Sequence, residues 1–377
     1  MDERADVVVV GGGVIGLAVA RELARKQVGS VLLVERVELG QEASFAAAGM
    51  LAPQAEANTD DAFFQLCCRS RDLYPTFAAQ LLEETGMDVE LDRTGTLYCA
   101  FTDHDLVEIE QRCEWQRRLG LSVEQLTARE ARELEPNLSE KVLAGLKFPL
   151  DTQVENRKLL RALIAANEKL GVRLCANTTV ESLRIEGGKV TGVATNRGLI
   201  NTRNVVLAGG AWTSFIKTEN RVPQISIEPV RGQIMCFAAD PPLARHVIYS
   251  PRGYLVPRRD GRLLAGSTTE EAGFVKEVTA AGLASIREHA LEIVPGVAEL
   301  QLVDSWAGLR PRAPDELPVL GKAGETEGLV FATGHYRNGI LLAPLTGELI
   351  AALIADNVVA TELQAFAPDR FAAVAVN

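Results

Sequence analysis

Four consecutive valines near the start of the chain, at residues 7–10, run directly into the glycine-rich stretch Gly11-Gly12-Gly13-Val14-Ile15-Gly16. An unbroken apolar run of this kind is typical of a strand that is buried on both faces of a parallel sheet. Gly11, Gly13 and Gly16 have the G-x-G-x-x-G spacing of a strand-to-helix turn that holds a pyrophosphate. We expect Gly11 to permit the tight turn, Gly13 to let the backbone approach the phosphates, and Gly16 to let the helix pack closely on the sheet.

The residues that follow complete a β-α-β unit. Apolar side chains recur at helical spacing from Val14 to Ala24, and a second buried strand is expected at residues 31–34. This strand ends at Glu35, where a carboxylate accepts hydrogen bonds from two ribose hydroxyls and repels a 2′-phosphate. The unit therefore favours FAD or NAD over NADP. The alternative for the glycine pattern is a tight turn that binds no ligand.

The composition limits the number of domains and the kind of partner. A chain of 377 residues, 47% of them hydrophobic, can bury a large core and suggests two domains or one elaborated domain. The 39 lysines and arginines against 50 aspartates and glutamates give a net charge of −11, and no basic run is sustained. We therefore expect neither a nucleic acid nor an anionic membrane as a partner.

Cysteine usage and hydropathy indicate a cytoplasmic protein. The six cysteines show neither a C-x-x-C pair nor the spacing of a metal site, so we expect reduced, partly buried thiols. The acidic start at residues 1–4 does not resemble a signal peptide. The most apolar helical candidate, residues 339–355, contains Pro344 and Glu348, which favours a buried core helix over a membrane span.

Parallel β-α units flank an antiparallel insert along the chain. The turns at Gly187-Gly188 and Asp260-Gly261 each predict a β-hairpin, and the alternation over residues 225–267 predicts antiparallel sheet. The other expected elements are helices at 62–84, 104–118, from 156 and at 344–355, a strand and short helix within 123–135, and buried strands at 172–175, 204–208 and 329–332. No linker divides the chain, so the domains are expected to be interleaved.

Four segments resemble a known family: the glycine turn with Glu35, residues 44–53 (SFAAAGMLAP), residues 306–311 (WAGLRP) and residues 334–344 (GHYRNGILLAP). The chain resembles the FAD-dependent amine oxidases, which include D-amino-acid oxidase, sarcosine oxidase and glycine oxidase, and its segments are most similar to those of the glycine oxidases. The resemblance implies an α/β fold with a Rossmann-like FAD-binding domain of the glutathione-reductase type and an interleaved antiparallel-sheet substrate-binding domain. The implied boundaries are 1–85, 150–222 and 306–377 for the first domain, and 86–149 and 223–305 for the second.

The resemblance also implies which residues line FAD. They are Gly11, Gly13, Val14, Ile15, Gly16, Glu35, Arg36, Ala43, Ser44, Ala48, Gly49, Met50, Val180, His335, Tyr336, Arg337, Asn338, Gly339, Ile340 and Leu341. The small side chains at residues 46–49 suit the approach of backbone amides to a phosphate or flavin edge; the alternative is a simple small-residue loop. A helix after residue 339 would direct its N-terminus at the flavin and stabilise negative charge there.

Arg310 is the candidate anchor for a substrate carboxylate, because guanidinium offers a planar two-pronged donor. The resemblance implies that Tyr254 adds a hydroxyl contact and that Arg337 lies beside substrate and flavin; these three form the predicted catalytic and substrate-binding set. Three alternatives stay open. Arg310 could be a structural arginine paired with a core carboxylate, Tyr254 could serve sheet packing alone, and Arg312 could be the anchor instead.

The implied reaction is oxidation of glycine, and of small amines such as sarcosine and D-alanine, by hydride transfer to FAD. Its products are the 2-oxo acid, ammonia or an amine, and hydrogen peroxide, and it requires no protein base. The resemblance further implies a role in thiamine thiazole biosynthesis, while the existence of a homo-oligomer stays open.

Two departures from relatives bear on this expectation. No cysteine follows Cys236, so FAD is expected to be bound non-covalently, and Thr269 stands where some glycine oxidases have methionine, which leaves the substrate preference open. The rival functions are a D-amino-acid or sarcosine dehydrogenase that uses another electron acceptor, and a non-catalytic module stabilised by flavin.

Overall fold

A six-stranded sheet carries the predicted strand–turn–helix unit at its centre in the computed structural model, which describes residues 3–218 and 222–371. The strands run in the order β19 (Val319–Lys322), β20 (Leu329–Thr333), β13 (Asn204–Leu207), β2 (Val7–Val10), β3 (Val31–Val34) and β9 (Arg173–Cys175). Neighbouring strands are parallel except for β19 and β20. This is the sheet expected from the valine-rich strands.

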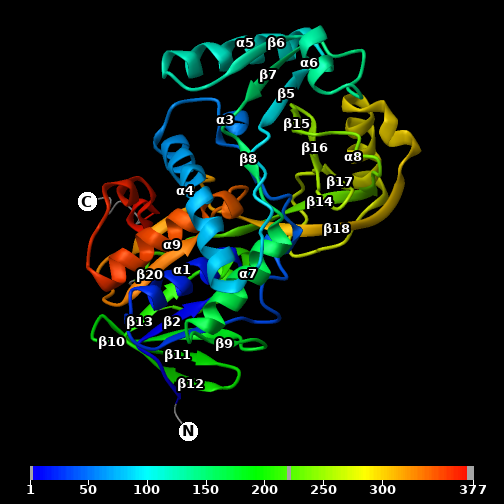
Figure 1. Cartoon of the computed structure of the whole chain (residues 1–377). Helices are drawn as coiled ribbons and strands as arrows, with labels where there is room; N and C mark the ends of the chain where they lie inside the picture. The colour runs from blue at the N-terminus through cyan, green and yellow to red at the C-terminus, as the bar shows by residue number, and fades with distance from the viewer. Residues whose placement is uncertain (1–2, 219–221, 372–377) are drawn as a thin grey trace.

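Different layers cover the two faces of this sheet (Figure 1). Because side chains alternate along a strand, Val7 and Val9 pack on helices while Val8 and Val10 pack on the opposite layer. The helical layer contains α1 (Val14–Arg25), α4 (Ala62–Thr85), α7 (Asn156–Lys169) and α9 (Gly339–Ala355). The opposite layer is a four-stranded sheet in the order β1 (Glu3–Arg4), β12 (Gly198–Asn201), β11 (Lys189–Thr195) and β10 (Val180–Glu186).

The second large sheet has eight strands and is mostly antiparallel. Their order is β18 (Gln301–Arg312), β14 (Glu228–Ala238), β17 (Arg262–Gly266), β16 (Gly253–Pro257), β15 (Val247–Ser250), β5 (Thr96–Ala100), β7 (Ala144–Phe148) and β6 (Glu124–Thr127). Strands β15 and β5 run parallel to each other. Helix α8 (Ala280–Ile293) packs on β14, β16 and β17, whereas α5 (Asp103–Arg118) and α6 (Ala128–Leu134) pack at the other end of the sheet.

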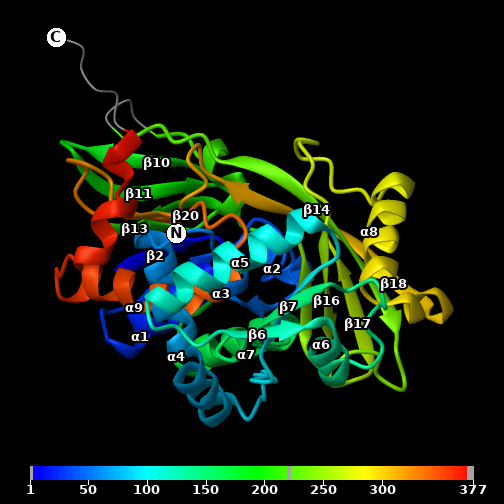
Figure 2. The same cartoon turned by 90° about the horizontal axis from the view of Figure 1, so that it is seen from above.

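Short elements lie between the two large sheets. Seen from above, α2 (Ala43–Ala46) and α3 (Pro53–Glu56) occupy this middle region (Figure 2). The remaining elements are β4 (Met50–Leu51), β8 (Thr152–Gln153), η1 (Gly210–Phe215), η2 (Pro295–Glu299), η3 (Thr361–Phe366) and η4 (Pro368–Phe371). The segment after β3 therefore runs from the six-stranded sheet towards the eight-stranded sheet.

The helix predicted at residues 344–355 begins five residues earlier, at Gly339. Pro344 has no amide hydrogen, so the carbonyl of Ile340 lacks its helical partner. The hydroxyl of Tyr74, on α4, donates to this carbonyl, and Ser70 Oγ donates to the carbonyl of Leu341. Packing against α4 thus lets α9 continue through the proline, so the structure has the longer of the two predicted helical ranges, residues 339–355.

Both predicted hairpins are confirmed, since β10 pairs with β11 and β16 pairs with β17 in antiparallel fashion. The structure also contains strand β18 and helix α8, which the sequence did not predict. The domain division stays a prediction. Strand β18 runs through its boundary at residue 306, and residues 1–2, 219–221 and 372–377, which include the predicted chain-end boundaries, lie outside the described residues.

Helix α9 is buried along most of its length, as expected for a core helix. Within the two described stretches, every helix is too short or too polar to cross a lipid bilayer. All six cysteines are free thiols, and four of them are buried: Cys67, Cys99, Cys113 and Cys236.

Candidate active site

One cavity of about 1210 Å³ is lined by residues of both large sheets and of the segment between them. Its lining includes most of the predicted site residues, namely Gly11, Gly13, Val14, Ile15, Glu35, Arg36, Ala43, Ser44, Ala48, Gly49, Met50, Val180, Tyr254, Arg310, His335, Tyr336, Arg337, Asn338, Gly339 and Ile340. Gly16 and Leu341 are not among the lining residues. Segments that are distant in sequence therefore meet at one cavity.

The glycine turn has the close packing that its spacing predicts. Gly11 has a φ of +113°, and a Cβ there would lie 2.3 Å from the carbonyl oxygen of Ala208. A Cβ at Gly16 would lie 1.9 Å from the carbonyl oxygen of Gly11, so α1 packs directly on the turn. At Gly13 the nearest atom to a Cβ would be Ser44 Oγ, at 3.3 Å. The first two positions require glycine for steric reasons, and the third leaves the backbone open to the cavity.

Glu35 is held beside this turn at the end of β3. Its Oε2 accepts a hydrogen bond from the amide of Gly12 at 2.7 Å, and Oε1 accepts one from the amide of Val37 at 3.1 Å. A carboxylate has further lone pairs, so both oxygens retain acceptor capacity for ligand hydroxyls. The next residue, Arg36, stacks on Trp212 with its guanidinium carbon 3.9 Å from the ring centroid.

The long helices α1 and α9 begin at the cavity, and neither has a cap from its own N-cap side chain. The described helices of seven residues or more that do have such a cap use Asp61, Thr102, Thr127, Glu155 and Thr279. Helices α1 and α9, which begin after Gly13 and Asn338, have none. Ser44 Oγ accepts the amide of Val14, but the other first-turn amides and the helix dipole favour an anion. Both ends therefore fit the negative groups of a dinucleotide.

Buried Arg258 supports the small-residue loop from behind. Its Nη2 donates to the carbonyl of Ala48 at 2.7 Å, and its Nη1 donates to the carbonyl of Val154 at 2.9 Å. Burial lowers the pKa of Arg258 to about 10. Gly49 has a φ of +72°, and a Cβ there would lie 2.1 Å from the Val154 carbonyl oxygen. The loop is thus fixed at the cavity wall, and residue 49 must be glycine.

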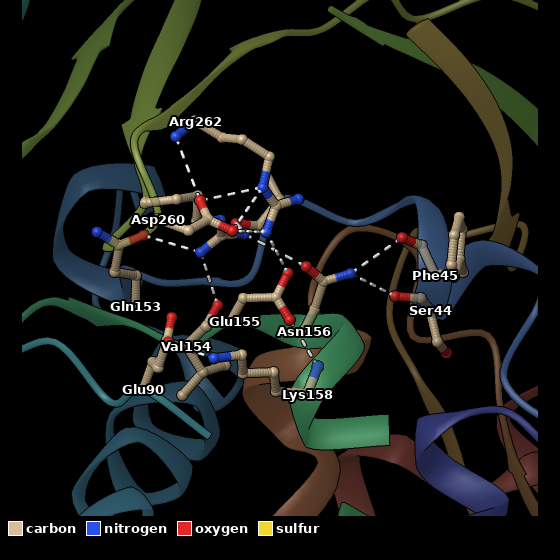
Figure 3. A network of polar contacts seen from close by, with 12 residues as sticks. Ser44, Phe45, Glu90, Gln153, Val154, Glu155, Asn156, Lys158, Asp260 and Arg262 are labelled. Atoms are coloured by element: carbon tan, nitrogen blue, oxygen red, sulfur yellow. Dashed lines mark hydrogen bonds and ion pairs between the residues drawn. The ribbon is translucent and has the colours of Figure 1, made fainter. Parts of the chain in front are cut away.

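Asn156 holds the preceding residues of the same loop (Figure 3). Its Nδ2 donates to the carbonyls of Ser44 and Phe45 at 2.9 and 3.0 Å, and its Oδ1 accepts from Arg258 Nη2 at 3.3 Å. Figure 3 shows Asn156 pointing towards the loop, with Gln153 and Glu155 in the same network. Because buried carbonyls require partners, this network holds one loop conformation.

Arg310 lies on β18 beside the backbone of β14. Its Nη2 donates to Ser267 Oγ at 2.7 Å, and its Nη1 donates to the carbonyl of Thr268 at 3.1 Å. The guanidinium covers Gly232, because a Cβ at that position would lie only 2.1 Å from Nη1. The neighbouring strand therefore leaves space for this side chain.

The arginines of the cavity lining fall into two groups, those that pair with a carboxylate and those that do not. Four arginines of the lining pair with carboxylates: Arg36, Arg112, Arg252 and Arg312. Among the described residues, Arg310 and Arg337 form no ion pair, and Arg337 Nη2 donates to Thr269 Oγ1 at 3.3 Å. Arg312 is bound by two glutamates, Glu228 and Glu271. Two guanidiniums without a carboxylate at one cavity suit an anionic ligand.

Tyr254 projects from β16 over Gly266, where a Cβ would lie 2.6 Å from the tyrosine hydroxyl oxygen. Burial raises the pKa of Tyr254, while Arg310 and a hydrogen bond with Ser267 oppose this rise. The hydroxyl therefore stays protonated at neutral pH and can donate a hydrogen bond. The centroid of Tyr249 lies 5.6 Å from that of Tyr254, so two tyrosines form this part of the wall.

His335 and Leu341 contribute differently from the expected flavin contacts. The imidazole of His335 is buried, with its Nε2 3.1 Å from Thr346 Oγ1, and burial lowers the pKa of His335 to about 3. The ring is therefore neutral and packs against α9. Leu341 is buried and not among the lining residues, and its carbonyl accepts a hydrogen bond from Ser70 Oγ at 2.7 Å. Its predicted contact with FAD stays a prediction.

Four further residues shape the site: Gly232, Gly266, Glu56 and Tyr249. A glycine inside a strand often marks the close approach of another group, so the two glycines carry a detectable signal. Glu56 and Tyr249 meet only through folding, because 193 positions separate them in the chain. No local pattern indicates that pair.

A parallel sheet with a glycine turn, an acidic strand end and a cavity shared with a second sheet is the arrangement of a dinucleotide-binding protein. The chain belongs to the DAO family of FAD dependent oxidoreductases, whose family model matches residues 6–353. FAD is therefore the cofactor, and the predicted α/β FAD-binding fold is confirmed.

Relatives of known name span the chain. It is 37% identical over 373 residues to a glycine oxidase of Geobacillus kaustophilus, with 98% of each chain covered. It is also 37% identical to the bifunctional protein ThiO/ThiG of a Synechocystis species, covering 98% of this chain but only 55% of that longer protein. The crystal structure of glycine oxidase from Geobacillus kaustophilus superposes with a TM-score of 0.94 at 36% identity, covering 98% of this chain and 99% of that one.

Proposed function

We propose that this protein is a glycine oxidase, which converts glycine, water and oxygen to glyoxylate, ammonia and hydrogen peroxide. The observation that carries the proposal is the pair of guanidiniums without carboxylate partners, Arg310 and Arg337, on the wall of the cavity that also contains the glycine turn. An amino-acid carboxylate complements these charges. The similarity to proteins named glycine oxidase supports glycine as the substrate.

In this proposal Arg310 binds the substrate carboxylate as a planar donor. Its contacts to Ser267 Oγ and the Thr268 carbonyl fix the orientation of the guanidinium before substrate arrives. The protonated hydroxyl of Tyr254 donates a further hydrogen bond, and Arg337 adds positive charge. Together these groups hold the substrate so that its Cα–H bond has one fixed direction.

Bound FAD supplies the hydride acceptor. The proposed holders of its phosphates and ribose are the amides at the start of α1 and the carboxylate of Glu35, while the backbone of Val180 contacts adenine. The loops at residues 43–50 and 335–341 enclose the ring system. The uncapped N-terminus of α9 stabilises negative charge at the flavin end of the cavity.

FAD is proposed to be bound non-covalently. Cys67 is the one thiol in the cavity lining among the described residues, and burial raises its pKa well above the ordinary value. A buried thiol that stays protonated is a poor nucleophile. Cys236, the last cysteine of the chain, does not line the cavity.

The proposed substrates are small, because Met50 and Tyr254 occupy the cavity wall. Glycine, sarcosine and D-alanine are expected to react faster than D-phenylalanine. We further propose that the protein is cytoplasmic and that its product enters thiamine thiazole biosynthesis; the similarity to ThiO/ThiG supports this role. The interleaved domain division predicted above belongs to the same proposal.

An anaerobic titration of the purified yellow protein with glycine tests the proposal. Glycine should bleach the flavin absorbance, and air should then restore it with formation of one hydrogen peroxide per glycine oxidised. Absence of bleaching would contradict catalysis and favour a non-catalytic module. Bleaching that only an artificial electron acceptor reverses, without peroxide, would favour the dehydrogenase alternative.

A further inference from the structure

Glu56 places a carboxylate on the cavity wall that the roles described so far do not use. It is the last residue of α3, and its Oε1 accepts a hydrogen bond from the Tyr249 hydroxyl at 2.5 Å. Among the described residues, no hydrogen bond or ion pair involves its Oε2. Both Glu56 and Tyr249 line the cavity with Arg310 and Arg337.

The backbone around Glu56 is fixed by two buried side chains, Asp151 and Arg112. Asp151 is fully buried and accepts the amides of Gln54 and Ala55 at 3.3 and 2.9 Å. On the other side, Arg112 donates to the carbonyls of Ala55 and Ala57. The charged end of Glu56 is therefore presented by a rigid segment, as a binding group requires.

The groups around Glu56 make a zwitterion the complementary ligand. The charged and titratable groups that interact with its carboxyl are Tyr249, Arg337, Arg310, Arg112, Tyr254 and Cys67. Burial raises the pKa of Glu56, while the Tyr249 hydrogen bond and the three guanidiniums oppose the rise. Arg112 already pairs with Glu108, whereas Arg310 and Arg337 pair with no described carboxylate. The carboxylate of Glu56 and the guanidiniums of Arg310 and Arg337 therefore line the same cavity and act on one another.

We propose that Glu56 binds the ammonium group of the amino-acid substrate and accepts one proton from it. In this step an N–H bond of the ammonium breaks, an O–H bond forms on Glu56, and the N–H electron pair stays on nitrogen as a lone pair. Hydride loss from carbon requires this neutral amine, because the lone pair stabilises the developing imine. The inference rests on the proposed function, and it assigns the amine end of the same substrate.

The Glu56→Gln variant tests this assignment, since glutamine keeps the size and the acceptor for Tyr249 but removes the charge. Its matched control is Glu316→Gln, which neutralises another carboxylate of the cavity lining; among the described residues, the Glu316 side chain forms no hydrogen bond or ion pair. Glycine binding is measured from the concentration at which the rate of anaerobic flavin reduction saturates. Binding of glycolate, a carboxylate that lacks an ammonium group, is measured from the change in flavin absorbance. We expect Glu56→Gln to weaken glycine binding at least about tenfold and to leave glycolate within about threefold.

The pH dependence supplies a second readout. In the wild type, the apparent second-order rate constant for anaerobic flavin reduction should be flat while Glu56 is ionised and glycine carries its ammonium. In Glu56→Gln only neutral glycine is productive, so this constant should rise about tenfold per pH unit below the pKa of the amine.

Equal weakening of glycine and glycolate, the same loss in Glu316→Gln, or an unchanged pH profile would each overturn the assignment of Glu56. The proposed function fails separately, and visibly, if glycine does not bleach the wild-type flavin.

Discussion

The guanidinium of Arg310 occupies the space that the absent side chain of Gly232 leaves on the neighbouring strand. The two strands are paired so that Gly232 lies opposite Gly308, two residues before Arg310. A methyl group at Gly232 would lie 2.1 to 2.3 Å from three guanidinium atoms. The position of the candidate substrate anchor is therefore set by a glycine on another strand.

Gly232→Ala should displace this guanidinium without removing it. We expect kcat/KM for glycine to fall by about tenfold or more, because a misdirected charged hydrogen bond loses a large part of its roughly 1.5–3 kcal/mol. FAD content, read from the absorbance ratio of flavin to protein, should stay normal. The control is Ala272→Gly, which exchanges the same two residue types outside the cavity lining. Normal kinetics in Gly232→Ala would show that Arg310 tolerates the displacement.

Arg310→Ala should remove the anchor itself. Loss of a two-pronged charged contact is expected to cost about 3–5 kcal/mol, which corresponds to a fall of roughly two to four orders of magnitude in kcat/KM. Arg310→Lys should stay clearly impaired, because an ammonium cannot reproduce the planar fork. Arg312→Ala is the matched control, since Arg312 is held by Glu228 and Glu271. A large loss in Arg312→Ala with little change in Arg310→Ala would reverse the assignment.

Arg258→Met should loosen the loop that lines the flavin end of the cavity. The substitution leaves the carbonyls of Ala48 and Val154 without their buried donor, at a cost of about 1–3 kcal/mol for each unsatisfied group. We expect the dissociation constant for FAD, measured from flavin fluorescence on dilution, to rise at least about tenfold. The neighbouring Arg259→Met provides the control, because Arg259 is exposed and pairs with Asp88. Equal FAD affinity in the two variants would mean that the loop holds its shape without Arg258.

Local sequence patterns predict the elements near the cofactor well. The valine run, the glycine turn and Glu35 lie within one β-α-β unit, so their relative positions follow from local geometry. The two hairpins also follow from short-range turn chemistry. The substrate end is different, because the partners of Arg310 come from residues 267 and 268, and those of Glu56 come from another strand. Such contacts depend on the pairing of distant strands, which no single segment encodes.

The first residue of α9 and the protonation of His335 also depend on contacts with distant residues. The apolar run predicts a helix over residues 339–355, whereas the proline favours a start at residue 344. The longer helix forms because Tyr74 of another helix satisfies the carbonyl that this proline leaves free. The histidine in the flavin-loop motif has a polar side chain, yet Thr346 and burial place it in the core as a neutral ring. In both cases tertiary packing decides what a local pattern leaves open.

His335→Gln should make stability less sensitive to acid. Burial lowers the pKa of His335 to about 3 in the folded protein, whereas an unfolded histidine has a pKa near 6.5. A group whose pKa is lowered by folding contributes stability above the unfolded pKa, and this contribution is lost as the pH falls towards the folded pKa. Between pH 7.5 and 5.5 the wild type should therefore lose about 1.4 kcal/mol of unfolding free energy relative to the variant, in which glutamine can still bond Thr346 but does not titrate. Urea unfolding of both FAD-loaded proteins at the two pH values measures this difference, and His104→Gln, at an exposed histidine, is the control. An equal pH dependence in wild type and His335→Gln would show that the imidazole can take up a proton in the folded state.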